Sequence, residues 1–207
     1  REMDNLTRTI FWVEHFLHGK PHVDFADIEL DLALLFMQRE KEEGRELFNW
    51  NRVICSHHDF KGVPDDLWKI YEQMATTPAR ILKIAVQAND ITDCLPIFRL
   101  LEHARDEGRE MIAVAMNQAG IATRILAPSR GAFLTYGSLD ETQTSAPGQI
   151  NADELRELYR VDKLNHQTEI MGLVASSVSH SISKYIHNAA FAASSMNAVY
   201  IPFEVKD

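Results

Sequence analysis

The segment "RILKIAVQANDITDCLPIFRLLEHARDEGREMIAVAM", residues 80–116, carries the clearest signal of the fold class. An apolar run at each end has the length of a buried strand, and the segment between them repeats apolar residues at helical spacing. Asp90 can cap that helix and Gly108 can end it. The predicted bounds are 80–86 for the first strand, 91–107 for the helix and 111–116 for the second strand. Because parallel strands need a crossover connection, this unit predicts a parallel sheet.

The same alternation continues on both sides of this unit. Further strands are expected at 23–30, 51–56 and 132–137. The expected helices lie at 3–19, after Pro64, and around 121–129, and between the first two strands apolar residues resume at 32–37 and a charged run ends at Gly44. Five strands alternating with helices place the chain in the α/β class.

A second pattern follows residue 150. Asn151 and Glu154 resemble a capping box for a helix to about residue 160. After a polar stretch that is typical of a linker, the expected elements are a strand at 169–175, a helix at 184–195 and a strand at 198–205. This pattern divides the chain into a first domain (1–160), a linker (161–168) and a second domain (169–207).

Composition narrows the class of protein. The chain has 207 residues and a net charge of −9, which argues against non-specific nucleic-acid binding. No apolar run approaches 18 residues, so no membrane span and no membrane partner are expected. The two cysteines, Cys55 and Cys94, suit a reducing compartment, and a cytoplasmic location is the expectation. The chain begins with Arg1 and is therefore expected to be a piece of a longer product.

Sites in parallel α/β folds lie at the carboxyl ends of the strands. The residues that this rule selects are Glu29, His57, His58, Asp59, Lys83 and Met116. Cys55 and His57 share one strand face, but no metal-binding motif occurs elsewhere, so no metal is predicted. Asp59 could orient a histidine or cap a turn.

Lys83 lies within the apolar run "ILKIAV". Desolvation lowers the pKa of a buried amine, and a neutral amine can form a Schiff base with a ketone. The alternative is a lysine that extends to water. His58, one strand-helix unit earlier, could carry protons for such a lysine, or could be a loop histidine exposed to solvent.

Two further features could bind a substrate. Arg124 follows Gly120 near a helix start and could hold a carboxylate, although a surface arginine is the commoner case. The turn "SAPGQI" (145–150) carries Ser145 and Gln149, which suit either a lid or an ordinary polar turn.

Six motifs in order resemble type I 3-dehydroquinate dehydratase. They are "DIEL" (27–30), "SHHDF" (56–60), "KIAV" (83–86), "GIATR" (120–124), "FLTYGS" (133–138) and "SAPGQI" (145–150). The resemblance implies a (β/α)8 TIM-barrel type of fold, of which about five strands are present here. It also implies a lyase that converts 3-dehydroquinate to 3-dehydroshikimate through an imine on lysine, with no cofactor.

The resemblance also implies residue roles. Lys83 would form the Schiff base and His58 would be the general acid and base. The residues implied to contact the substrate are Glu29, Met116, Arg124, Tyr136, Ser145 and Gln149. Position 136 is often Phe in that family, so the hydroxyl of Tyr136 is a departure from it.

Residues 172–191 resemble the start of shikimate dehydrogenase. Ser181 and Ser183 match the serines that hold shikimate there, although N-capping of the next helix is an alternative role. Lys184 replaces a proline of that family. A complete dehydrogenase implies NADP, but this sequence has no Gly-x-Gly-x-x-Gly turn. The order of the two resemblances matches bifunctional shikimate-pathway enzymes.

Several expectations follow for the whole protein. The partner is a small-molecule substrate, oligomers are possible, and a plastid location would apply to a plant protein. A barrel needs eight strands, so the chain alone is expected to be inactive and to associate through its edges at 23–30 and 133–137. The alternatives are an inactive folding or interaction module and a class I aldolase-type Schiff-base barrel.

Overall fold

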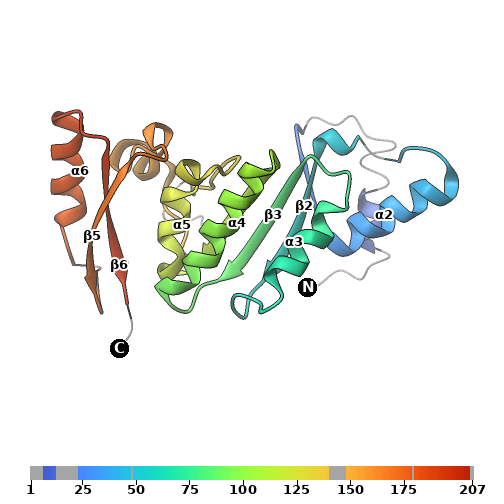
Figure 1. The fold of residues 1–207 in the computed structure, drawn as a ribbon, viewed down its shortest axis with the longest axis horizontal. Helices are drawn as coiled ribbons and strands as arrows, with labels where there is room; N and C mark the ends of the chain where they lie inside the picture. Colours follow the sequence, from blue (N-terminus) through green and yellow to red (C-terminus); the bar gives the residue numbers. More distant parts are fainter. Residues whose placement is uncertain (1–6, 13–22, 48, 140–147, 179, 206–207) are drawn as a thin grey trace. The chain divides into compact units, whose positions relative to one another are not determined.

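The computed structural model describes residues 7–12, 23–47, 49–139, 148–178 and 180–205. Four strands are hydrogen-bonded in the order β1-β2-β3-β4, and two more form a separate sheet (Figure 1). Compact packing divides the chain into two units. One is Arg1–His57 with Asp66–Lys83, and the other is His58–Asp65 with Ile84–Asp207.

The four-stranded sheet confirms the parallel α/β prediction. Its strands are β1 (Ala26–Glu29), β2 (Val53–Asp59), β3 (Ile81–Gln87) and β4 (Glu110–Met116). A helix separates each strand from the next: α2 (Leu30–Glu43), α3 (Leu67–Ala75) and α4 (Cys94–Asp106). β1 and β2 are parallel, with Ala26 opposite Val53 and Glu29 opposite Ser56. Successive connections through helices are what a barrel of the TIM type requires.

In the first unit, α2 and α3 bury the apolar stripes that their sequences carry. Phe36 and Met74 are fully buried, one on each helix. Gly44 ends α2, with φ of 65° and its N–H donating to the Glu40 carbonyl at 2.9 Å. The Glu40 carboxylate also accepts a hydrogen bond from Trp50 Nε1 at 2.7 Å. These contacts fix the connection that leads into β2.

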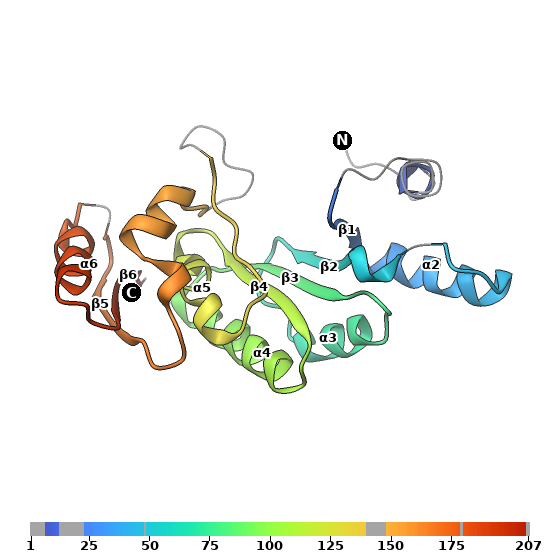
Figure 2. The ribbon, with the colours of Figure 1, turned by 90° about the horizontal axis from the view of Figure 1, so that it is seen from above.

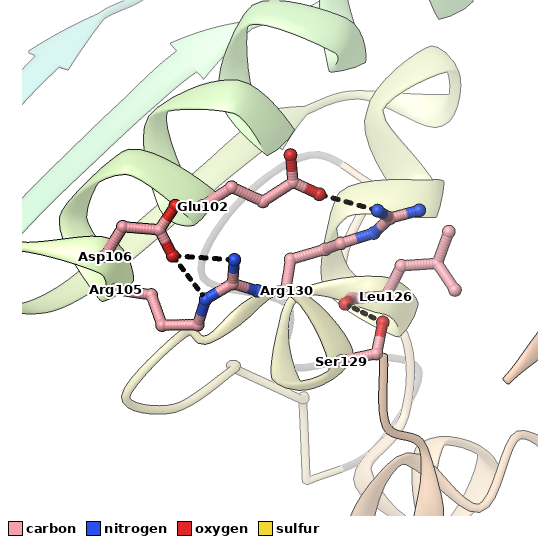
Figure 3. A network of polar contacts seen from close by, with 6 residues as sticks. All are labelled: Glu102, Arg105, Asp106, Leu126, Ser129 and Arg130. Carbon is pink, nitrogen blue, oxygen red and sulfur yellow. Dashed lines mark hydrogen bonds and ion pairs between the residues drawn. The ribbon is translucent and has the colours of Figure 1, made fainter. Parts of the chain in front are cut away.

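In the second unit, α4 follows a short 3₁₀ turn, η2 (Ile91–Asp93), in which Asp90 forms the predicted cap. The next helix, α5 (Ile121–Leu126), ends earlier than expected and leads into the 3₁₀ turn η4 (Pro128–Arg130). Figure 3 shows how η4 is held: Arg130 pairs with Glu102 of α4 at 2.6 Å, and the Ser129 hydroxyl donates to the Leu126 carbonyl. These bonds attach the end of α5 to α4.

The fifth predicted strand, 132–137, is wrong. The Phe133 N–H donates to the Met111 carbonyl at 2.7 Å, but the described residues 132–137 form no strand ladder with β4. Thr135 instead donates to the Arg124 carbonyl. Ser138 forms a single bridge with Asn151. Residues 132–136 are only half-buried, and the hydrogen bonds of this stretch go to Met111, to α5 and to residues 150–152.

The capping box predicted at Asn151 and Glu154 is confirmed for Asn151 and wrong for Glu154. Asn151 Oδ1 accepts from the Asp153 N–H at 2.8 Å, as a cap does. The Glu154 carboxylate instead binds Lys184, and the helix has a π-helical turn over Glu154–Leu158. A distant cation has therefore taken the partner that the local pattern assigned to the cap.

The second sheet confirms the expected βαβ unit. It consists of β5 (Glu169–Ala175), α6 (Ser183–Ala193) and β6 (Ala198–Glu204), with β5 and β6 parallel. Figure 2 shows α6 beside the pair of strands. Val161 and Leu164, within the predicted linker, are buried in the same hydrophobic cluster as Val199. The boundaries of the proposed domains stay predictions.

A helix was expected at 3–19. Residues 7–12 are helical, and the other residues of that range lie outside the described residues.

Candidate active site

Lys83 forms an ion pair with Asp27. Its Nζ lies 2.6 Å from Asp27 Oδ2, and the Lys83 side chain is 14% exposed. Lys83 lies in β3 between the fully buried Leu82 and Ile84. Sequence reasoning missed Asp27 as a site residue. The signal was present, because Asp27 lies two residues before Glu29 in β1 and therefore shares its strand face.

The two adjacent histidines belong to opposite faces of β2. Side chains alternate along a strand, so His58 lies on the face of Ser56 and His57 lies on the face of Cys55. Ser56 is opposite Glu29 in the register with β1. The His58 ring stacks on Phe60, with ring centres 6.1 Å apart. The faces alone therefore distinguish His58 from His57.

Asp59 caps the turn that follows β2. Its Oδ1 accepts hydrogen bonds from the N–H groups of Lys61 and Gly62, at 2.7 and 3.3 Å. This geometry matches the turn-capping alternative. The carboxylate therefore stabilises the exit from the strand end that carries the histidines.

Arg124 is a buried cation. It lies on α5 with 2% exposure, and its Nε has no hydrogen-bond partner among the described residues. Burial lowers the pKa of its guanidinium. These observations exclude the surface-arginine alternative. A buried guanidinium whose Nε lacks an acceptor is costly, and an anion would satisfy it.

The start of α5 is fixed tightly against the end of β4. A Cβ on Gly120 would lie 2.0 Å from the Ala115 carbonyl oxygen, so only glycine permits this approach. The Thr123 hydroxyl accepts from the Ala115 N–H at 2.9 Å and donates to the Gly120 carbonyl at 2.7 Å. Met116, the last residue of β4, is buried. The sequence pattern "GIATR" thus serves to place Arg124 beside the carboxyl end of a strand.

Asn117 is a second residue that sequence reasoning missed. Its φ of 68° and ψ of 177° belong to a region that is occupied almost only by glycine. Its Nδ2 donates to the Ala88 carbonyl at 3.2 Å. A Cβ on Gly148, which has φ of 71°, would lie 2.3 Å from the Asn117 carbonyl oxygen. Gly148 therefore packs directly on the strained backbone at the end of β4.

For the remaining residues predicted to contact a substrate, the structure gives exposure or a local contact but no evidence of a substrate role. Tyr136 and Gln149 are half-buried, and Ser145 lies outside the described residues. The Ser181 hydroxyl accepts from the Ser183 N–H at 3.3 Å just before α6, in the manner of a capping turn. The roles of these residues stay predictions.

In the part of the chain that the structure describes, there is no metal-binding cluster, and the pKa of Cys94 argues against thiol chemistry at that residue. No three His, Cys, Asp or Glu side chains gather there as a metal would require. Burial raises the pKa of the Cys94 thiol to about 12, which makes it a poor nucleophile. None of the described helices combines the length and the apolar character needed to cross a membrane.

The fold and the placement of Lys83 define a parallel α/β protein of the TIM-barrel type. A scan of family models matches residues 3–166 to "Type I 3-dehydroquinase". The chain therefore belongs to the type I 3-dehydroquinase family, as the resemblance had indicated.

Relatives support this membership. A bifunctional 3-dehydroquinate dehydratase/shikimate dehydrogenase of Arabidopsis thaliana is 33% identical over 180 residues, covering 86% of this chain and 29% of that protein. A 3-dehydroquinate dehydratase of Methanosarcina mazei is 32% identical over 151 residues, covering 72% and 62%. The crystal structure of a 3-dehydroquinate dehydratase from Geobacillus kaustophilus is 29% identical with a TM-score of 0.54, covering 67% and 53%. The chain thus spans 29% to 62% of the length of these two curated relatives.

Proposed function

We propose that this protein removes water from 3-dehydroquinate to give 3-dehydroshikimate, through an imine on Lys83. The observation that carries the proposal is the position of Lys83, which is largely buried on a central strand of a chain that belongs to the type I 3-dehydroquinase family. Two relatives are named as dehydratases of this substrate. The role in the shikimate pathway follows from the same relationship.

The proposed reaction begins with attack of the Lys83 amine on the ketone of the substrate. Loss of water gives an imine that retains a proton on nitrogen, and this positive nitrogen stabilises the carbanion-like enamine better than a ketone would. His58 removes the proton next to the imine and then returns a proton to the departing hydroxyl. Hydrolysis of the imine releases the product and restores the amine. No cofactor is needed, and Asp27, 2.6 Å from the amine, orients it.

Arg124 is proposed to bind the substrate carboxylate. Its burial and the unpartnered Nε support this role, because a carboxylate would supply the missing acceptors. Gln149 and Ser145 are proposed to bind the ring from the "SAPGQI" segment. Glu29, Met116 and Tyr136 complete the proposed set of contact residues.

Borohydride reduction of the full-length gene product in the presence of 3-dehydroquinate tests the proposal. Reduction should convert the imine to a stable amine and add the mass of the bound ligand to the peptide that carries Lys83. An adduct on another lysine, or active protein without any adduct, would contradict the Lys83 assignment. A protein that neither turns over 3-dehydroquinate nor forms an adduct would favour an inactive module, and turnover of aldol substrates would favour the aldolase alternative.

The tail, residues 169–207, is proposed to be the start of a shikimate dehydrogenase. The Arabidopsis match covers more of the chain than residues 1–166 can supply, so the similarity extends beyond the family model. Ser181 and Ser183 would contact shikimate, and NADP would serve the complete dehydrogenase. The 207-residue chain should not oxidise shikimate with NADP, and any such oxidation would contradict this division of domains. For the whole protein we also propose a cytoplasmic location, or a plastid location if it is a plant protein, and association into oligomers.

A further inference from the structure

Lys184 connects the tail to the segment that follows Gln149. Its Nζ donates a hydrogen bond to Glu154 Oε1 at 2.6 Å. Lys184 lies in the first turn of α6, and Glu154 begins the π-helical turn. The two side chains are 24% and 29% exposed. Partial burial makes such a pair stronger than one on the open surface.

An apolar core reinforces this connection. Ile150, Leu155 and Tyr159 belong to one buried cluster with Val199 and Ile201 of β6. Closely packed side chains transmit displacement, because the interior has little free volume. Segment 150–159 and the tail should therefore move together.

Gln149 is attached to the beginning of this packed segment. The Ser138 N–H donates to the Ile150 carbonyl, and the Ala152 N–H donates to the Ser138 carbonyl, both at 2.9 Å. Gln149 also lines a polar cavity of about 290 Å³ together with Glu154 and Lys184. The position of the Gln149 backbone is thus set by the segment that Lys184 holds.

The charge on Lys184 favours this contact at neutral pH. Burial alone would lower the pKa of the amine, but the hydrogen bond to Glu154 and the attraction of Tyr159 and Glu154 outweigh it, so the net pKa is raised. Lys184 Nζ also lies 5.0 Å from the centre of the Tyr185 ring, where the π face favours a cation.

We propose that Lys184 is a positioning residue for Gln149. Through its ion pair with Glu154, it holds segment 150–159 against β6 and so determines where the Gln149 amide meets the substrate. The inference rests on the proposed function, and it makes the tail a structural part of the dehydratase site. A dehydrogenase-like element would then support the first reaction without contacting its substrate.

Steady-state kinetics on the full-length gene product test this proposal. Lys184→Met and Glu154→Gln should each raise KM for 3-dehydroquinate about tenfold while kcat changes less than about twofold, because the loss affects binding rather than the chemical step. The double exchange Glu154→Lys/Lys184→Glu should restore KM to within about twofold of the wild type. Adding Lys184→Met to Gln149→Ala should raise KM no further than Gln149→Ala alone, because both changes remove one contact.

Lys163→Met is the matched control, because Lys163 is an exposed lysine of the nearby turn η6 (Val161–Lys163). Its KM should equal that of the wild type. Amide exchange in peptides covering 148–160 should quicken in Lys184→Met and stay unchanged in α4. Faster exchange with an unchanged KM would overturn the proposal, since Lys184 would then be only structural. Additive effects with Gln149→Ala would also overturn it. A wild type without turnover would overturn the proposed function, and this inference with it.

Discussion

Lys83 and Lys184 form ion pairs of the same N–O distance in different surroundings. Each amine lies 2.6 Å from a carboxylate oxygen, of Asp27 and Glu154 respectively. Lys83 lies on a strand between two fully buried side chains, whereas Lys184 lies at the start of a helix beside the half-exposed Tyr185. The distance of an ion pair therefore does not tell its role. What surrounds the pair decides whether the lysine can meet a substrate or can only hold another segment.

Replacing Lys83 should have the largest effect. Lys83→Met should lower kcat/KM by at least about 10³-fold, because the covalent intermediate cannot form. Lys184→Met, the matched change at the other ion pair, should keep kcat near the wild-type value. The two variants should be compared in one spectrophotometric assay of product formation. Similar losses of kcat in both would remove the distinction between the two lysines.

The two histidines near the end of β2 test the proposed chemistry at the Lys83 site. His58→Ala should lower kcat by about 10²–10⁴-fold, because a general acid and base is lost. His57→Ala should cost far less, since His57 lies on the other strand face. Pre-steady-state measurement of proton abstraction would check that the lost step is the one assigned to His58. A greater loss in His57→Ala would show that the assignment of faces is wrong.

Both lysines pair with a carboxylate, whereas Arg124 has no carboxylate partner among the described residues. Arg124→Met should raise KM roughly 10- to 100-fold, which corresponds to about 1.5–3 kcal/mol for hydrogen bonds to a charged group. The same change should leave the thermal unfolding temperature unchanged or higher, because an incompletely satisfied buried charge is replaced by an apolar side chain. Calorimetry and kinetics on the same sample would check this. A large loss of stability with an unchanged KM would indicate a structural role.

The last prediction concerns Tyr159, which packs near Lys184, and applies only at alkaline pH. Burial raises the pKa of Tyr159 from its ordinary value of 10 to about 12. The unfolded chain releases this proton first, so the associated stability is present below about pH 10 and is lost as pH rises towards 12. The loss amounts to about 3 kcal/mol at full titration. Denaturant unfolding of Tyr159→Phe should show a shallower decline above pH 10, and an unchanged decline would contradict it.

The sequence by itself determined the class of fold, the order of its elements and several of their ends. Buried strands and amphipathic helices have local periods, so the alternation from 23 to 116 and the βαβ unit of the tail could be predicted from neighbouring residues. Glycines that end helices, such as Gly44 and Gly108, act through their own backbone and could also be recognised. The motifs on which the proposed roles of Lys83, His58 and Arg124 rest are likewise readable in the chain.

Only the tertiary structure decided which charged groups meet. Asp27 and Lys83 are 56 residues apart, and Glu154 and Lys184 are 30 apart, so no local period relates them. The segment 132–137 has the composition of a strand, yet it does not pair with β4 along its length, and only the Phe133 N–H bonds to the Met111 carbonyl. The burial of Arg124 also depends on the packing of α5 against β4, which a helical pattern alone does not reveal. Local sequence fixes the conformation of a segment, but the partner of a side chain depends on how distant segments pack.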